Sequence, residues 1–222
     1  MEVLIVADSA AGFDLAALGG SEFAACRIVE VGPITERGAA AARGLLAATT
    51  PIAGLIEDHS FPEPEWAEAL LRAHAMGWTG VGPAVCNANP ESVGSWVNYI
   101  LSYGGFAPPV PAGERDLLPW HNSAYKRDAL APFEQRLGEL LEWEGALQAE
   151  LRARGHSLYL EPAARTHHSN VSALWSTAVG EAWGLLVGAG DAVARTEDYE
   201  LNRVRHLSRR DREASRATAP AG

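Results

Sequence analysis

A short apolar segment that runs straight into three ionisable residues constrains the fold of this chain more than any other feature. Residues 52–56 follow Pro51 and read as a buried strand, and Glu57, Asp58 and His59 come directly after it. In open α/β sheets, ligands bind beyond the carboxyl ends of the strands. The sequence therefore predicts an α/β fold with a functional site at the end of this strand.

The rest of the chain alternates between strand-like and helical segments. The first half follows a strand-to-helix crossover pattern, which favours one domain with a mostly parallel central sheet flanked by helices. Thr35 is the predicted cap of the first helix. The predicted strands are residues 2–7, 26–31, 52–56, 78–86 and 156–160, and the predicted helices are residues 35–48, 65–75, 93–103 and 133–154, the last as one long helix or a pair.

Charge and cysteine content argue against several classes of function. The formal net charge of −10 disfavours extended contacts with nucleic acid or an anionic membrane, because both need clustered Lys and Arg. The basic run at residues 203–216 also contains acids and is interpreted as a solvated helix or tail. Cys26 and Cys86 are too few for a disulfide framework. With no secretion signal and no apolar run of ~18 residues, we expect no membrane span and a cytoplasmic location.

The three ionisable residues after the strand are candidate metal ligands. In an extended stretch, the side chains of Glu57 and His59 point to the same side, so the two can share one ion. Carboxylate oxygens suit Mg²⁺ and Mn²⁺, and an imidazole shifts the preference towards Mn²⁺. A solvated acidic turn is the alternative interpretation of the same tripeptide.

Several segments, in order along residues 2–190, resemble motifs of family 2 glycosyltransferases. Residues 2–8, EVLIVAD, resemble the strand whose terminal acid approaches the nucleotide base, and residues 37–44, RGAAAARG, resemble the donor-site helix. Residues 55–59, LIEDH, stand in the place of the Asp-x-Asp motif, and residues 62–66, PEPEW, match the turn into the next helix.

The second half of the chain continues the resemblance. Residues 118–127, LPWHNSAYKR, are similar to the segment that enters the acceptor side. Residues 142–147, EWEGAL, with Leu151 and Gly155 at the family spacing, resemble the motif that supplies the catalytic base, and this register puts Glu144 in the base position. A histidine from the region after the late strand often returns to the metal in such enzymes. His168 is favoured over His167 for this role, and a pair of surface histidines is the alternative.

The resemblance implies a GT-A (Rossmann-like) domain over residues 1–190, with residues 191–222 as a charged helix or tail. It implies metal-dependent, inverting transfer of a sugar from a nucleotide-sugar donor to an acceptor hydroxyl, with Mn²⁺ or Mg²⁺ as cofactor. Without the Gln-x-x-Arg-Trp segment of processive synthases, a non-processive reaction is expected. The implied site residues are Glu144 as catalytic base, Asp8, Arg37, Arg43 and Asp58 for the donor, Glu57, His59 and His168 for the metal, and Trp120, His121, Asn122 and Trp143 for the acceptor.

Three departures from the family keep other functions open. The family's first strand and helix, with their Pro-x-Tyr-Asn-like motif, are expected to be missing before Glu2. The metal motif has Glu and His where two aspartates are commonest, and the base motif reads Trp-Glu in place of Glu-Asp. A catalytically silent or partner-dependent GT-A-like module, completed by a second copy or another chain, is therefore the main alternative. A metal-dependent hydrolase is the third.

Overall fold

The structure is a computed structural model that describes residues 1–171. The predicted charged tail, residues 191–222, lies outside the described residues, together with the last part of the predicted domain, residues 172–190. All the predicted site residues lie within the described part. Among the described residues, no helix combines the length and the apolar character needed to cross a lipid bilayer.

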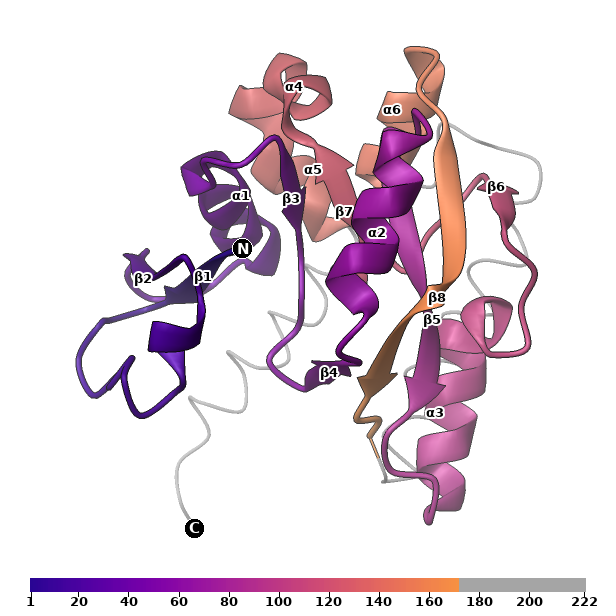
Figure 1. Ribbon diagram of the computed structural model, residues 1–222, viewed down its shortest axis with the longest axis horizontal. Coiled ribbons are helices and arrows are strands. Elements are labelled where there is room, and N and C mark those ends of the chain that lie inside the picture. Colours follow the sequence, from indigo (N-terminus) through magenta and orange to yellow (C-terminus); the bar gives the residue numbers. More distant parts are fainter. Residues whose placement is uncertain (172–222) are drawn as a thin grey trace, which may run out of the picture. The chain divides into compact units, whose positions relative to one another are not determined.

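The strands of residues 1–171 form two sheets (Figure 1). The larger sheet has the order β3-β7-β5-β8-β4, with β6 also paired to β8, and the smaller sheet is the parallel pair β1-β2. The strands are β1 (Glu2–Ala7), β2 (Ala25–Glu30), β3 (Ile52–Gly54), β4 (Ser60–Pro62), β5 (Gly80–Asn87), β6 (Gly113–Arg115), β7 (Ala124–Lys126) and β8 (Leu158–His168).

The larger sheet is mixed, which departs from the mostly parallel sheet that the sequence predicts. The pairs β1-β2 and β5-β8 are parallel, whereas β3-β7, β5-β7, β4-β8 and β6-β8 are antiparallel. The sequence pattern missed β4, β6 and β7 because each is only three residues long and carries no readable periodicity. These short strands form within connecting segments. Because no helical crossover precedes them, nothing requires them to run parallel to their neighbours.

Each of the four predicted helical segments contains helix in the structure, but most of their ends differ, and a short helix at Arg127–Leu130 was not predicted. The prediction for residues 93–103 is confirmed by α3, and the predicted helix at residues 133–154 is divided into η4, α5 and α6. The division falls at Gly145, which adopts a left-handed backbone conformation with φ of 79°. The helices are α1 (Arg37–Ala47), α2 (Trp66–Ala75), α3 (Val93–Tyr103), α4 (Arg127–Leu130), α5 (Leu137–Glu142) and α6 (Ala146–Ala153), with short 3₁₀ turns η1 (Gly20–Glu22), η2 (Gly104–Phe106), η3 (Trp120–Asn122) and η4 (Ala131–Arg136).

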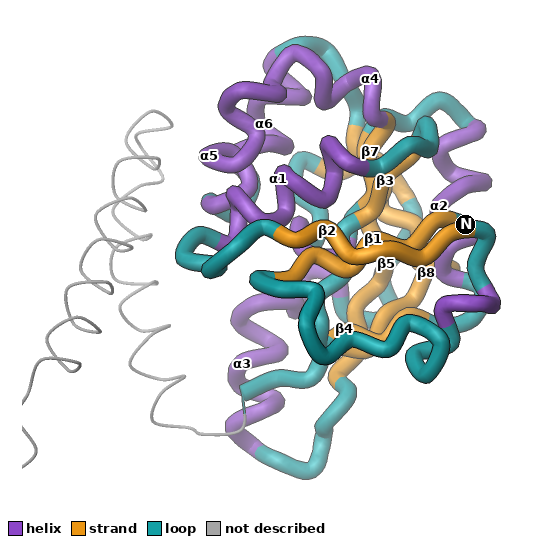
Figure 2. Tube along the Cα trace, turned by 90° about the vertical axis from the view of Figure 1, so that its left-hand side faces the viewer, coloured by secondary structure: helices purple, strands orange, loops and turns teal. Residues whose placement is uncertain are grey.

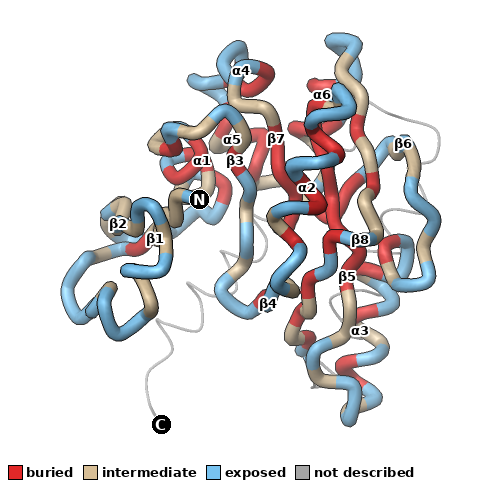
Figure 3. Tube along the Cα trace, viewed as in Figure 1, coloured by how far each residue is buried: buried red, intermediate tan, exposed pale blue. Residues whose placement is uncertain are grey.

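The core lies along β5 and β8 (Figure 3). Val81, Val85, Leu158 and Leu160 on these two strands are fully buried. Strands buried on both faces read as nearly continuous apolar runs, which explains why residues 78–86 are recognisable as a strand in the sequence. Trp66, at the start of α2, is 7% exposed and packs with Leu70 of the same helix.

The N-terminus of α1 is capped by a side chain from a distant part of the sequence. The predicted cap, Thr35, is wrong: the cap position is Glu36, which makes no side-chain capping bond. Instead the Gly38 backbone N–H donates to Glu142 Oε2 over 2.6 Å, and α1 and α5 lie side by side (Figure 2). A carboxylate at a helix N-terminus is favoured by the helix dipole and by the unpaired N–H groups there.

Gly38 is the point of closest approach between α1 and α5. A Cβ at Gly38 would overlap the carbonyl oxygen of Gly138 and the backbone nitrogen of Glu142. Because these obstacles are backbone atoms, we expect Gly38→Ala to lower the free energy of unfolding by about 3 kcal/mol, the upper end of the usual cost of overpacking. The melting temperature would then fall by about 2–4 °C for each kcal/mol of lost stability. The matched control is Gly105→Ala, where a Cβ meets no atom within 4 Å; equal melting temperatures for the two variants would contradict the close helix contact.

Candidate metal and donor site

Strand pairing brings two separate segments together at the end of β3. Leu55, just after β3, donates its backbone N–H to the carbonyl of Ser123 over 3.0 Å, and this fixes the start of the Glu57–His59 loop. The loop runs directly into β4, which pairs with the end of β8 so that Ser60 lies opposite His168. In addition, the Ser169 N–H donates to the His59 carbonyl over 3.0 Å. The loop and the end of β8 therefore converge on one place.

The carboxylate of Glu57 is the centre of this site. Its side chain is 15% exposed. Oε2 accepts hydrogen bonds from the Tyr103 hydroxyl at 3.2 Å and from Asn122 Nδ2 at 3.3 Å, and His168 Nε2 lies 3.3 Å away. Oε1 lies 3.6 Å from His121 Nδ1 and 3.9 Å from His59 Nε2.

Glu57, His59 and His168 form a group that is able to hold a metal ion. One ligand atom from each residue lies within 4.8 Å of the other two. Both histidines also have a partner at the nitrogen that faces away from Glu57: His59 Nδ1 is 2.7 Å from Asp58 Oδ1, and His168 Nδ1 is 3.0 Å from Asn170 Oδ1. Metal-binding histidines commonly donate this second nitrogen's N–H to such an acceptor, which leaves the other nitrogen free to bind the ion.

The electrostatics of the site keep a negative charge on Glu57. Burial by itself raises the pKa of Glu57, but the hydrogen bond from His168 and the charges of His121, His168 and His59 lower it further, to about 2. Burial, the charge of Glu57 and its hydrogen bond raise the pKa of Tyr103, so this phenol stays protonated and donates to the carboxylate. Burial lowers the pKa of His121 to about 4, against the opposing effect of Glu57. At neutral pH the site therefore presents a carboxylate beside a neutral His121.

The turn that carries Trp120, His121 and Asn122 is fixed by a buried glutamine. Gln148 on α6 accepts from the Leu118 backbone N–H at 2.8 Å and donates to the Leu118 carbonyl at 3.2 Å. The structure places His121 and Asn122 against Glu57, and the Trp120 ring contacts the His121 ring with a centroid distance of 3.3 Å and an angle of 38° between the ring planes. The predicted acceptor residues on this turn thus border the predicted metal ligands.

The two carboxylates of the predicted base motif have different surroundings. Glu142 is the cap of α1, because its Oε2 accepts from the Gly38 N–H. Glu144 is exposed in the turn between α5 and α6, next to the half-buried Trp143, and its charge acts on Tyr103 at the metal site. The charge of Glu144 therefore reaches the metal site, while its role as the base stays a prediction from the sequence.

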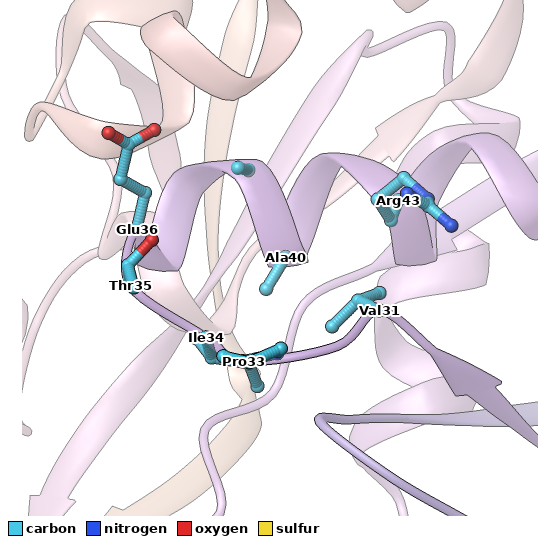
Figure 4. A pocket seen from close by; sticks show the side chains of 8 residues that line it. Val31, Pro33, Ile34, Thr35, Glu36, Ala40 and Arg43 are labelled. Atoms are coloured by element: carbon cyan, nitrogen blue, oxygen red, sulfur yellow. The ribbon is translucent and has the colours of Figure 1, made fainter.

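The four predicted donor residues occupy different surroundings. The charge of Arg37, at the start of α1, acts on His121 and Tyr103. Arg43, later on the same helix, lines a small cavity of about 110 Å³ together with Val31 and Pro33 (Figure 4). Asp8 follows β1 and is exposed. The Asp58 side chain is 98% exposed.

The choice between the adjacent histidines 167 and 168 follows from strand alternation. Successive side chains on β8 point to opposite faces. His168 faces Glu57 with its side chain 8% exposed, whereas His167 Nε2 pairs with Glu63 at 3.0 Å on the other face. The structure therefore brings His168 to the predicted metal ligands.

Sequence reasoning missed two residues of the site, Tyr103 and Asn170. Tyr103 ends α3 and reaches Glu57 across 46 residues of sequence, so only helix packing brings it there. Asn170 stands two residues after His168 and accepts from its ring. A His-x-Asn pattern at the end of a strand is a local signal that could have identified Asn170.

The residues present fit a divalent transition ion. One carboxylate and two imidazoles are a donor set more typical of Mn²⁺ and other transition ions than of Mg²⁺, which prefers oxygen ligands. Moreover, Asn122 Oδ1 is buried next to Glu57 and has no hydrogen-bond partner within the described part of the chain. Buried polar atoms are rarely left without a partner, so this oxygen points to a further group at the site.

Comparisons with known proteins identify the fold. No protein-family model matches the sequence, and a search of curated proteins finds no match. Among solved structures, a crystal structure of GalNAc-T7 with UDP, GalNAc and Mn²⁺ is similar over 77% of this chain, with a TM-score of 0.58 and 11% sequence identity. A crystal structure of a mycobacterial protein is similar over 79% of this chain and 58% of its own length, with a TM-score of 0.44 and 15% identity.

The first comparison shows a GT-A-like fold. The present chain spans only 37% of the GalNAc-T7 chain, and at 11% identity the likeness concerns the fold alone. A mixed α/β domain with a central sheet flanked by helices is thereby confirmed. Two findings therefore bear on the function. One is the GT-A-like fold, and the other is a group of three residues able to hold a metal ion.

Proposed function

We propose that this protein is a metal-dependent glycosyltransferase that transfers a sugar from a nucleotide-sugar donor to an acceptor hydroxyl. The observation that carries the proposal is the convergence of Glu57, His59 and His168 at the end of β3 in a GT-A-like fold. The solved neighbour GalNAc-T7 was crystallised with UDP and Mn²⁺, which supports Mn²⁺ as the cofactor and a nucleotide-sugar as the donor.

In this proposal, the protein's own residues hold the ion and position the reactants. A bound divalent ion supplies Lewis-acid stabilisation of the negative charge on the departing nucleoside diphosphate. Glu57, His59 and His168 hold it, and Tyr103 and Asn122 hold the Glu57 carboxylate through their hydrogen bonds.

The remaining roles follow the resemblance to family 2 and are proposals of the same kind. Glu144 acts as the base that takes the proton of the acceptor hydroxyl, which gives inversion at the anomeric carbon in a non-processive reaction. Asp8, Arg37 and Arg43, with Asp58, serve the donor. The acceptor side consists of Trp120, His121, Asn122 and Trp143. The cytoplasmic location stays a prediction from the sequence.

The test is calorimetric titration of the purified chain with UDP, GDP and dTDP, with Mn²⁺ and then with EDTA. We expect one nucleotide to bind in the presence of Mn²⁺ and to lose its affinity in EDTA and in the variant His59→Ala. The result would also identify the donor nucleotide. A folded protein that binds Mn²⁺ but none of the three nucleotides would overturn the proposal of a self-sufficient transferase.

One feature of the fold favours a second candidate, a GT-A-like module that depends on a partner chain. Within residues 1–171, β1 and β3 each pair with a strand on one side only, and a cavity of about 480 Å³ lies between them, lined mostly by apolar side chains of β1, α1 and the β3 region. Unpaired strand edges are a common template for pairing with another chain. Nucleotide binding that appears only after addition of a completing chain would support this candidate.

A further inference from the structure

Behind His168, away from Glu57, lies a buried cluster of polar side chains that the proposed chemistry does not use. Its members are Asn87 and Asn89 at the end of β5, Ser95 on α3 and Asn170 after β8. Ser95 is 0% exposed and Asn170 is 4% exposed. The contact of this cluster with the ring of a metal-binding candidate is from Asn170 Oδ1 to His168 Nδ1, at 3.0 Å.

The orientation of the Asn170 carboxamide is determined by its neighbours. Its Nδ2 donates both hydrogens, to Asn87 Oδ1 at 3.0 Å and to the His168 carbonyl at 2.9 Å. If the carboxamide were turned over, its oxygen would face these two acceptors without a hydrogen between them. Oδ1 therefore faces His168.

The backbone of Asn170 is held just as firmly. The Asn170 N–H donates to Asn89 Oδ1 at 2.8 Å, and Asn89 Nδ2 donates in return to the Asn170 carbonyl at 2.8 Å. The Ser95 hydroxyl lies 2.9 Å from both Asn87 Oδ1 and Asn89 Oδ1 and donates to this pair of acceptors. Although Asn87 Nδ2 has no partner within the described residues, every bond that reaches Asn170 is made, and together these bonds give its side chain one orientation.

This orientation determines the tautomer of His168. An amide oxygen only accepts hydrogen bonds, so Nδ1 of the ring carries a hydrogen, and Nε2 is the nitrogen that can offer its lone pair to a metal ion. Nε2 is the atom that lies 3.3 Å from Glu57 Oε2. The Asp58 side chain that pairs with His59, by contrast, is 98% exposed, so water competes with this contact.

We propose that Asn170 is a positioning residue of the metal site: its carboxamide, held by Asn87, Asn89 and Ser95, fixes the tautomer and ring orientation of His168 and so presents Nε2 to the ion. The inference rests on the proposed function, because it requires that His168 binds a metal. Loss of such an outer partner typically weakens metal binding 10–100-fold.

The test compares Asn170→Ala with the wild-type chain by two measurements. The first is Mn²⁺ affinity by calorimetry, where we expect the variant to bind about 10–100-fold more weakly. The second is the ¹⁵N chemical shifts of the His168 ring in the metal-free protein, assigned with His168→Ala. We expect the wild-type ring to carry its hydrogen on Nδ1 and the variant to show a mixture of tautomers. Asn98→Ala on α3 is the matched control, with affinity and tautomer unchanged.

The outcomes separate this inference from the proposed function. If the wild-type chain does not bind Mn²⁺, the proposed function and this inference both fail. If the wild-type chain binds, His168→Ala does not, and Asn170→Ala binds as tightly as wild type, then only the role of Asn170 is overturned. If Asn170→Ala does not fold, the same two measurements are made on Asn170→Ser. The serine hydroxyl can still form a hydrogen bond within the cluster, but the side chain is too short to reach His168 Nδ1.

Discussion

Replacement of Glu57 by glutamine is expected to weaken Mn²⁺ binding by more than about 100-fold, beyond the usual loss for an outer partner, because it removes a direct ligand. Glutamine keeps nearly the same shape and can still accept the hydrogen bonds from Tyr103 and Asn122, so the local structure should persist. What disappears is the negative charge that would attract a cation to the site beside the two histidines. The low pKa of Glu57, about 2, means that the wild-type residue carries this charge at any pH suitable for the assay.

Calorimetry measures this loss directly, and thermal unfolding measures it independently. A ligand present at 100 times its Kd stabilises a folded protein by about 2.7 kcal/mol, so Mn²⁺ should raise the melting temperature of the wild-type chain and leave that of Glu57→Gln unchanged. Glu63→Gln is the matched control, since Glu63 pairs with His167 on the opposite face of β8. Equal Mn²⁺ affinity of Glu57→Gln and wild type would exclude the metal site.

Replacement of Glu144 by glutamine is expected to reduce sugar transfer by about 10²–10⁴-fold, which is the usual contribution of a general base. The variant keeps the side-chain size, and Glu144 is exposed in the turn before α6, so the fold should be unaffected. Affinity for Mn²⁺ and for the nucleotide should stay at the wild-type level, because the proposed ligands are Glu57, His59 and His168. The measurement is the release of nucleoside diphosphate from the sugar nucleotide whose base the titrations identify.

Glu142→Gln provides the contrast within the same motif. Glu142 caps α1 through the Gly38 N–H, a bond that the glutamine oxygen can still accept without the favourable charge. We therefore expect a slightly lower melting temperature and normal turnover. If Glu142→Gln rather than Glu144→Gln abolished turnover, the assignment of the base would move to Glu142. If both variants kept full turnover, a different base would be required.

The site was predictable from the sequence where its residues are neighbours in the chain. Glu57 and His59 follow a recognisable strand and are only two residues apart. The expected extended stretch is wrong, because β3 ends at Gly54 and the chain turns at Asp58 and His59, with the Ser60 N–H bonded to the Glu57 carbonyl. The third ligand, His168, lies more than a hundred residues away, and the sequence favoured it over His167 only through a family resemblance. The pairing of β4 with β8 decides between the two, because it sets which of them faces Glu57.

The positions of His121, Asn122 and Tyr103 could not be predicted from neighbouring residues in the chain. The sequence assigns His121 and Asn122 to the acceptor, and in the structure both lie against the carboxylate of Glu57, a candidate metal ligand. Their position depends on how Gln148 holds the preceding loop, and that of Tyr103 depends on how α3 packs. Contacts of this kind leave no periodic pattern.

The amino-acid sequence by itself determined the α/β class, the positions of most helices and of β1, β2 and β5, and the place of the Glu57–His59 motif after a strand. Of the longest strand, β8 (Leu158–His168), the prediction for residues 156–160 covered only the first part. Hydrophobic periodicity is a local property, so any segment long enough to show it can be read directly. The tertiary structure alone decided the mixed direction of the sheet, the capping of α1 by Glu142, and the ring of side chains around Glu57. These features depend on short strands and on contacts between distant residues, whose energies arise only after the chain has packed.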